Sequence, residues 1–156
     1  MSTSTVTPAP PTVPGYVDWI AKRLLRSRLH PLLSRRTMLL SFTGRKSGKL
    51  YVAVVRYIRD GDLVTCYTDS KWWINLRDNA TVELLIGGQT RAGVAEVVED
   101  PAAVADSLTA FLHATPGDSK YYGVRRDADG LPDPHDITET AKRTKLIRIT
   151  LAQPAR

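Results

Sequence analysis

Six short apolar runs, separated by turn residues, restrict this 156-residue chain to a small antiparallel β fold. Asp60-Gly61 and Gly87-Gly88 are hairpin signals, and the runs beside them are rich in β-branched residues. The runs predict strands over residues 37–43, 51–59, 63–68, 81–86, 91–98 and 144–151. Strands joined by turns this short pair antiparallel, and closing the sheet on itself removes its edges. We therefore expect a mainly β (α+β) fold, a closed or nearly closed six-stranded barrel with short flanking helices.

Helical spacing of apolar residues marks three further segments. The pattern predicts an amphipathic helix over 15–33, a short helix over 72–79 that Asp69-Ser70 can cap, and a helix over 101–114 that begins at a proline. The stretch 116–140 is polar and contains several glycines and prolines, so we expect an irregular segment there.

The size of the chain fits one domain, which we place over residues 15–156. Residues 1–14 are rich in Ser, Thr and Pro and predict a disordered arm without a secretion signal. Cys66 is the only cysteine, so it cannot form an intrachain disulfide; we expect it to be buried and inert. A reducing, cytoplasmic location fits this composition.

The net charge of +6 is unevenly distributed. Eleven of the 22 Lys and Arg residues lie between Trp19 and Arg59, a segment without any acidic residue. Such asymmetry indicates an anionic partner, namely a phosphorylated cofactor, a lipid surface or a nucleic acid; the alternative is a solvated basic face. The basic amphipathic segment 16–34 suggests peripheral contact with an anionic membrane at its inner face. No nucleic-acid-binding motif is present, so we expect no nucleic-acid partner.

The turn 43–49 combines two glycines with Arg45, Lys46, Ser47 and Lys49. Its backbone N–H groups, its charges and its hydroxyl can hold a phosphate through charge-assisted hydrogen bonds. It is not a Walker A loop, because Gly-Lys-Ser/Thr is missing and no helix follows. The alternative is a solvated basic hairpin turn.

Two other motifs carry aromatic side chains. Ser70-Lys71-Trp72-Trp73 stands at the start of the short helix, where N–H donors favour an anion, and either tryptophan can flank a flat ring or belong to the core. Tyr121-Tyr122 can close over a ligand and donate a proton, or pack on the surface. No set of histidines has metal-ligand spacing, and no nucleophile elbow or dinucleotide fingerprint occurs, so we expect no metal site. If the protein is an enzyme, a bound cofactor supplies its reactive group.

These motifs, in this order, resemble the deazaflavin-dependent nitroreductase/quinone reductase family of the flavin-reductase-like split β-barrel superfamily. Thr43-Gly44-Arg45-Lys46-Ser47-Gly48 is similar to the signature turn, and Ser70-Lys71 to the Ser-Lys pair that follows the third strand. Trp72-Trp73-Ile74-Asn75-Leu76 is similar to the aromatic pair and Asn-Leu run. This chain departs from the family at Leu50-Tyr51, where many members have Pro-Arg, and at Ala80, where proline is usual.

The resemblance implies a split β-barrel that binds reduced coenzyme F420 and transfers a hydride to a quinone, an enone or a nitro compound. The implied cofactor-binding residues are Arg45, Lys46, Ser47, Gly48, Ala53, Val54, Val55, Ser70, Lys71, Trp72 and Asn75, and the implied catalytic residues are Tyr121 and Tyr122. The alternatives are an FMN-binding reductase and a non-catalytic basic protein that binds a cofactor or a membrane. The resemblance allows a monomer or a homodimer.

Overall fold

The computed structural model describes residues 36–78 and 80–153. The predicted arm 1–14 and the amphipathic segment 15–33 lie outside the described residues. The described elements are β1 (Thr37–Thr43), β2 (Leu50–Asp60), β3 (Leu63–Thr68), the 3-10 helix η2 (Lys71–Trp73), α2 (Ile74–Asp78), β4 (Thr81–Ile86), β5 (Gln89–Val98), α3 (Pro101–Ala114), the 3-10 helix η3 (Pro116–Tyr122), α4 (Pro134–Arg143) and β6 (Lys145–Leu151).

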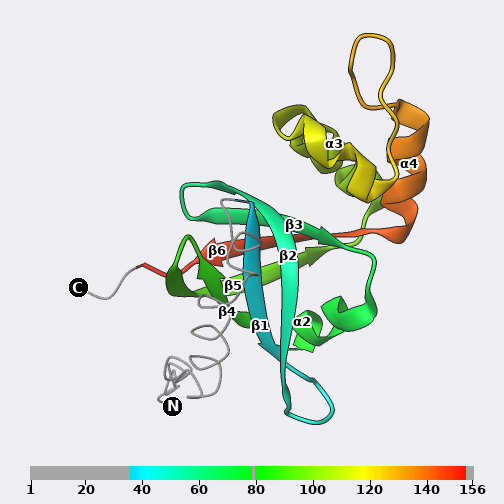
Figure 1. Cartoon of the computed structure of the whole chain (residues 1–156). Helices are drawn as coiled ribbons and strands as arrows, with labels where there is room; N and C mark the ends of the chain where they lie inside the picture. The colour runs from blue at the N-terminus through cyan, green and yellow to red at the C-terminus, as the bar shows by residue number, and fades with distance from the viewer. Residues whose placement is uncertain (1–35, 79, 154–156) are drawn as a thin grey trace, which may run out of the picture.

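The six strands form one closed antiparallel barrel in the order β1-β2-β3-β6-β5-β4 (Figure 1). Pairing of β1 with β4, in which Leu40 lies opposite Leu84, closes the cylinder. Closure of a sheet on itself is the usual way in which a small antiparallel sheet limits its free edges. In this barrel, residues 50–56 of β2 pair with β1, and residues 57–60 pair with β3. The predicted six-stranded barrel is confirmed, with strand ends shifted by at most two residues.

Alternating side chains of the strands fill the barrel. Met38, Leu40, Leu84 and Ile147 are completely buried in this core, as is Cys66. Along β3 the neighbouring residue, Tyr67, points the opposite way, out of the barrel and into a second apolar cluster. Successive side chains of a strand point to opposite faces of the sheet. Apolar residues on both faces of β3 therefore contribute to two cores, one inside the barrel and one on its outer surface.

The second core lies between the barrel and a layer made by α3, η3 and α4 (Figure 1). Tyr67 and Leu146, which face each other across β3 and β6, pack against Leu108 and Phe111 of α3. The rings of Tyr67 and Phe111 meet edge to face with centroids 5.1 Å apart. This layer covers the barrel beside the end of β3, where the chain enters η2.

The expectation of an irregular segment over 116–140 holds only for residues 123–133 and was wrong for the rest, because residues 116–122 form η3 and α4 begins at Pro134. The Asp133 carboxylate caps α4 by accepting a hydrogen bond from the Asp136 N–H, and Pro134 fits the first turn, where no N–H is needed. Ile137 and Ala141 form the buried stripe that faces α3. These signals, an Asp-Pro start followed by an i, i+4 apolar pair, are present in the sequence but are hidden among polar residues.

Burial of two titratable groups next to each other on β3 predicts a loss of stability in alkaline solution. Burial raises the pKa of the Cys66 thiol from 9.0 to about 12 and that of the Tyr67 phenol from 10.0 to about 12. Both groups keep their protons in the folded state while the unfolded chain loses them, so the free energy of unfolding decreases as the pH rises from about 9 to about 12. Below pH 9 this contribution is fully present.

Urea unfolding between about pH 8 and pH 12 measures this effect. Tyr67→Phe removes one of the two groups and should flatten the pH dependence. Tyr51→Phe, at an exposed tyrosine, serves as the control and should leave the curve unchanged. A curve that is equally steep in both variants would contradict this assignment to Tyr67.

Candidate active site

The β1–β2 turn is a tight hairpin that presents its charged residues to solvent. Its backbone closes through the Gly44 N–H, which donates to the Lys49 carbonyl at 2.7 Å, and the Gly48 N–H, which donates to the Gly44 carbonyl at 3.0 Å. Gly48 has a φ of 65°, a left-handed conformation that glycine adopts without steric cost. Arg45 and Lys46 are exposed on this turn.

Asn75 connects the turn to the segment that follows β3. The Arg45 N–H donates to Asn75 Oδ1 at 2.9 Å, and Asn75 Nδ2 donates to the Trp72 carbonyl at 3.0 Å. On the same side, the Phe42 ring stacks on Trp72 with centroids 5.1 Å apart. The two motifs separated by some thirty residues in the sequence, the basic turn and Ser70-Lys71-Trp72, are thus held together at one place on the barrel.

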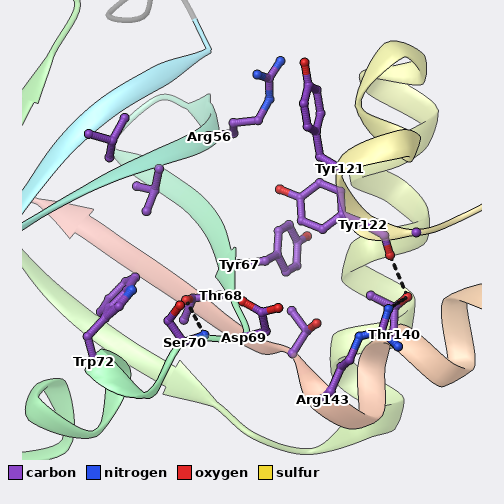
Figure 2. Close-up of a pocket in the computed structure, with 14 residues that line it drawn as sticks. Arg56, Tyr67, Thr68, Asp69, Ser70, Trp72, Tyr121, Tyr122, Thr140 and Arg143 are labelled. Carbon is purple, nitrogen blue, oxygen red and sulfur yellow. Dashed lines mark hydrogen bonds between the residues drawn. The ribbon is translucent and has the colours of Figure 1, made fainter.

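A cavity of about 390 Å³ begins at Trp72 and extends to the helical layer (Figure 2). Its volume lies within the about 300–1,000 Å³ that is usual for ligand pockets. One wall is the outer face of β2, one is the segment between β3 and η2, and one is formed by η3 and the end of α4. The lining residues are Val54, Val55, Arg56, Tyr67, Thr68, Asp69, Ser70, Trp72, Tyr121, Tyr122, Gly123, Thr140, Arg143 and Thr144.

An ion pair between β2 and η3 defines the upper edge of this cavity. Arg56 donates two hydrogen bonds to the Asp118 carboxylate, from Nε at 3.0 Å and from Nη2 at 2.8 Å. The Asp118 side chain is 2% exposed and that of Arg56 is 33% exposed. The hydrogen bonds with Asp118 raise the pKa of Arg56 further above its ordinary value. The Arg56 guanidinium also lies over the ring of Tyr121, 4.3 Å from its centroid, as Figure 2 shows.

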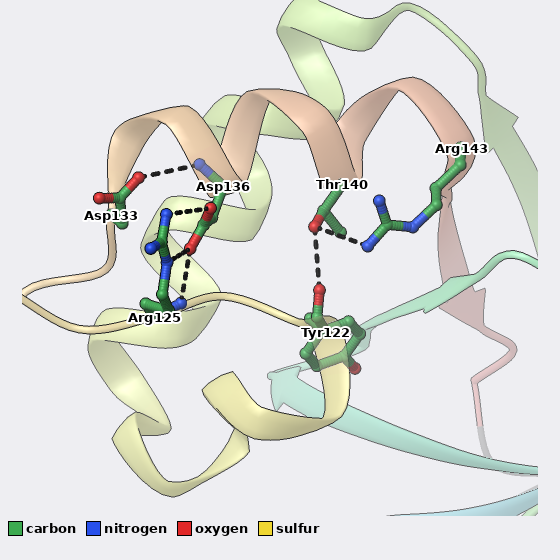
Figure 3. Close-up of polar contacts among 6 residues, drawn as sticks. All are labelled: Tyr122, Arg125, Asp133, Asp136, Thr140 and Arg143. Atoms are coloured by element: carbon green, nitrogen blue, oxygen red, sulfur yellow. Dashed lines mark hydrogen bonds and ion pairs between the residues drawn. The ribbon is translucent and has the colours of Figure 1, made fainter.

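Tyr121 and Tyr122 occupy different environments. Tyr121 is 57% exposed, whereas Tyr122 packs edge to face against Tyr67 and Phe111 in the second core. Burial, and then the nearby Asp118 carboxylate, raise the pKa of the Tyr122 phenol. The Thr140 hydroxyl donates to the Tyr122 carbonyl at 2.9 Å and accepts a hydrogen bond from Arg143 at 3.2 Å (Figure 3). Tyr122 is therefore anchored through both its ring and its backbone.

Gly123 ends the tyrosine segment with a φ of 68°, again a left-handed conformation. A Cβ at this position would lie 3.4 Å from Arg143 Nη2, an ordinary van der Waals distance, so the left-handed backbone is what favours glycine here. Further along, Arg125 is paired with Asp136 at 2.8 Å, which fixes the return of the chain to α4 (Figure 3).

The cavity unites six of the residues proposed from the sequence, namely Val54, Val55, Ser70, Trp72, Tyr121 and Tyr122. Arg45, Lys46, Ser47 and Gly48 lie on the adjoining turn, and Lys71 is exposed beside Trp72. Ala53 does not line the cavity but packs against the barrel core. Asn75 bridges the turn and η2, and its direct contact with a cofactor stays a prediction.

The expectation that Asp69-Ser70 caps the short helix needs a correction. Ser70 is the N-cap residue, but its side chain makes no capping hydrogen bond. Instead, the Ser70 N–H donates to the Thr68 hydroxyl at 3.1 Å, and both Asp69 and Ser70 line the cavity. The loop conformation that aims these residues inward competes with side-chain capping.

The sequence did not identify the Arg56–Asp118 pair, nor Thr140 and Arg143 of α4 and Thr144, which follows this helix. Arg56 and Asp118 are 62 positions apart, and nothing local marks them as partners. Arg143 and Thr144 would have become candidates only if α4 had been predicted. The one signal in the sequence is their position, since Arg143 stands directly before the last predicted strand and Thr144 begins it.

Within residues 36–78 and 80–153, no three His, Cys, Asp or Glu side chains are grouped as metal ligands. In the same part of the chain, none of the helices has the length and apolar character needed to span a bilayer.

Comparison with protein families adds independent information. Residues 19–109, more than half of the chain, match the family described as F420H(2)-dependent quinone reductase. No curated protein matches the sequence. The matched segment includes the basic turn, β2 and the Ser70-Lys71-Trp72 motif.

Several solved structures are similar to the chain. The heme storage protein HutZ of Vibrio cholerae superposes with a TM-score of 0.53 at 14% identity, over 81% of this chain and 89% of that one. A conserved hypothetical protein of Mycobacterium tuberculosis has a TM-score of 0.52 at 18% identity, with 81% of each chain covered. An FAD-binding protein of Mesorhizobium loti has a TM-score of 0.51 at 16% identity, over 81% of this chain and 91% of that one. At these identities the similarity concerns the fold, and the predicted split β-barrel is confirmed.

Proposed function

The chain belongs to the F420H(2)-dependent quinone reductase family and is therefore a deazaflavin-dependent oxidoreductase. We propose that it reduces a quinone, an enone or a nitro compound in the cavity beside Trp72. The observation that carries this proposal is the hydrogen bond from the Arg45 N–H to Asn75 Oδ1. It joins the two segments that were proposed, on separate grounds, to bind an anion.

The residues of the site fit a cofactor with a charged tail and a flat ring. Arg45, Lys46 and Lys71 offer positive charge at one end of the site, and Ser47 offers a hydroxyl. Trp72 and Val54 offer apolar surface to a ring at the adjoining end of the cavity. A cationic turn beside the apolar surface of Trp72 and Val54 suits a molecule in which phosphate and carboxylate groups are attached to a redox-active ring.

When bound, reduced F420 would supply a hydride to an electrophilic acceptor. The protein would contribute orientation and the exclusion of water. The turn and η2 would hold the charged tail, and the outer face of β2 would support the ring. Tyr121 and Tyr122 lie opposite that face, where a phenol can approach the acceptor.

Equilibrium titration tests the proposal directly. We expect both oxidised and reduced F420 to bind with a Kd below about 100 μM, and a quinone to oxidise the bound reduced form. The assay follows the absorbance and fluorescence of the coenzyme. Failure of either form to bind at that concentration would overturn the assignment of this cofactor to this chain.

FMN is the alternative cofactor, and a parallel titration separates the two. F420 carries an acidic tail beyond its phosphate, so the cationic turn should give it the higher affinity and the stronger salt dependence. Tighter binding of FMN, with turnover, would favour the alternative.

Cytoplasmic location, the oligomeric state and membrane contact through residues 16–34 stay predictions, and that segment lies outside the described residues. Sedimentation with anionic vesicles tests the membrane contact. Replacing Lys22, Arg23, Arg26 and Arg28 by Gln should release the protein from the vesicles, and equal sedimentation of both forms would exclude this role for the segment.

A further inference from the structure

We propose that the acceptor reduced in this cavity carries an anionic group, such as a carboxylate, apart from its reducible ring, and that Arg143 and Thr144 bind this group. This inference rests on the proposed function and names the class of acceptor that the site selects. Arg143 is then a specificity-determining residue, which binds the acceptor without taking part in the transfer of the hydride.

The first support is the balance of charge in the cavity wall, which contains the three charged side chains Arg56, Asp69 and Arg143. Arg56 is neutralised by the buried Asp118 carboxylate. Arg143 forms no ion pair with a carboxylate in the described part of the chain, where its guanidinium donates from Nη2 to Thr140 Oγ1 at 3.2 Å. A guanidinium has five N–H donors, so the others are available to a ligand.

The helical layer holds the Arg143 guanidinium in place. Thr140 is 2% exposed, and its hydroxyl donates its single hydrogen to the Tyr122 carbonyl at 2.9 Å, so toward Arg143 the same oxygen can only accept (Figure 3). Arg143 is also the last residue of α4, where the carbonyl end of the helix favours a cation. A donor oriented in this way loses little freedom when it binds an anion.

Thr144 adds a neutral donor beside this cation. It directly follows α4, is 4% exposed and lines the cavity. Its hydroxyl makes no hydrogen bond to any of the described residues. A guanidinium and a hydroxyl on the wall of one cavity can together bind the oxygens of a carboxylate through charge-assisted hydrogen bonds.

Asp69 restricts where an anionic group can lie. Its carboxylate lines the cavity on the segment between β3 and η2, so negative charge on the acceptor is repelled there and attracted toward α4. Figure 2 shows Trp72 and Arg143 at separate ends of the group of lining residues. Because the cofactor ring is proposed to lie beside Trp72, an acceptor bound to Arg143 through its anionic group places its reducible ring between the two.

The experiment uses two acceptors that share one ring and differ in charge: a 1,4-naphthoquinone that carries a propanoate side chain, and the methyl ester of the same compound. Equilibrium dialysis against the full chain saturated with oxidised F420 gives the Kd of each acceptor without turnover, and steady-state rates with reduced F420 give KM and kcat. We expect the carboxylate to have a Kd and a KM about 10-fold lower than those of the ester, and the difference to decrease at high salt.

Arg143→Met should remove this preference, because the carboxylate binds about 10-fold more weakly while the Kd for F420 and the kcat/KM for the ester stay unchanged. Arg143→Lys keeps the charge without the planar fork and should retain part of the preference. Thr144→Val should weaken binding of the carboxylate by about 3-fold. Lys142→Met removes the same charge from a neighbouring position that does not line the cavity, and this control should bind both acceptors as the unaltered protein does.

Equal binding of the carboxylate and the ester to the unaltered protein would overturn the proposal, and so would retention of the preference in Arg143→Met. A higher Kd for F420 in Arg143→Met, with the same loss for both acceptors, would also overturn it, because Arg143 would then belong to the cofactor site. Failure of the unaltered protein to bind F420 would reject the proposed function itself. That result is distinct, since F420 binding is measured before any acceptor is added.

Discussion

Replacing Lys46 and Lys71 together by methionine is expected to weaken F420 binding by about 10- to 100-fold. Each lysine would contribute a charge-assisted hydrogen bond to the anionic tail, worth about 1 kcal/mol at an exposed position. Both side chains are exposed, on the turn and on η2 respectively. Methionine keeps the length and apolar part of the side chain, so the loss reports the charge.

Titration at low and high salt measures this effect, since screening should reduce the difference between the variant and the unaltered protein. Lys142→Met, at an exposed lysine of α4, is the matched control and should leave the Kd unchanged. An unchanged Kd in the double variant would remove the turn and η2 from the binding site.

Asn75→Ala tests whether F420 binding depends on the geometry that joins the turn to η2, without any change in charge. It removes no charge, but it removes the acceptor for the Arg45 N–H and the donor to the Trp72 carbonyl. If the geometry between the turn and η2 is needed, F420 binding should weaken by about 10-fold although every cation is still present.

Arg56→Met is expected to lower the free energy of unfolding by about 3 kcal/mol, the largest effect on stability that we predict for a residue of the cavity. The reason is the asymmetric burial of the ion pair. Asp118 is 2% exposed, so removal of Arg56 leaves a buried carboxylate without its partner. Asp118→Asn should cost less, about 1 kcal/mol, because the remaining guanidinium is 33% exposed and water can reach it.

Urea unfolding with a constant slope measures both losses. Lys142→Met, which breaks the pair with Glu139 in which both side chains are exposed, is the control and should have a much smaller effect. If Asp118→Asn destabilises the protein more than Arg56→Met does, the explanation from asymmetric burial is wrong.

Local patterns were sufficient to predict the strands and the candidate anion-binding segments. Thr37–Thr43, Leu63–Thr68 and Thr81–Ile86 were predicted with their observed bounds, because a short apolar run between turn signals is a property of a few neighbouring positions. Pro101–Ala114 was likewise predicted in full from its proline start and its apolar spacing. The basic turn and Trp72 were identified for the same reason, since their chemistry is visible in consecutive residues.

The missed helix α4 shows where local reasoning ends. Its buried stripe consists of Ile137, Thr140 and Ala141, and two of these three residues have small or polar side chains. Such a stripe can be recognised as a buried helix face only when the surface of α3 on which it packs is known. The helix is thus stabilised by a tertiary contact with α3, which cannot be predicted from the residues of α4 alone.

The amino-acid sequence by itself determined the barrel, the basic turn and the kind of ligand that these residues can hold, because each depends on side chains close together in the chain. Only the tertiary structure decided which of them meet. It joined Arg45 to Asn75 and placed Arg56 against Asp118. It also left the Tyr121 side chain exposed while Tyr122 packs against the second core. The physical reason is that burial and pairing of charges depend on contacts between residues tens of positions apart, and those contacts exist only after the barrel has closed and the helices have packed on its outer face.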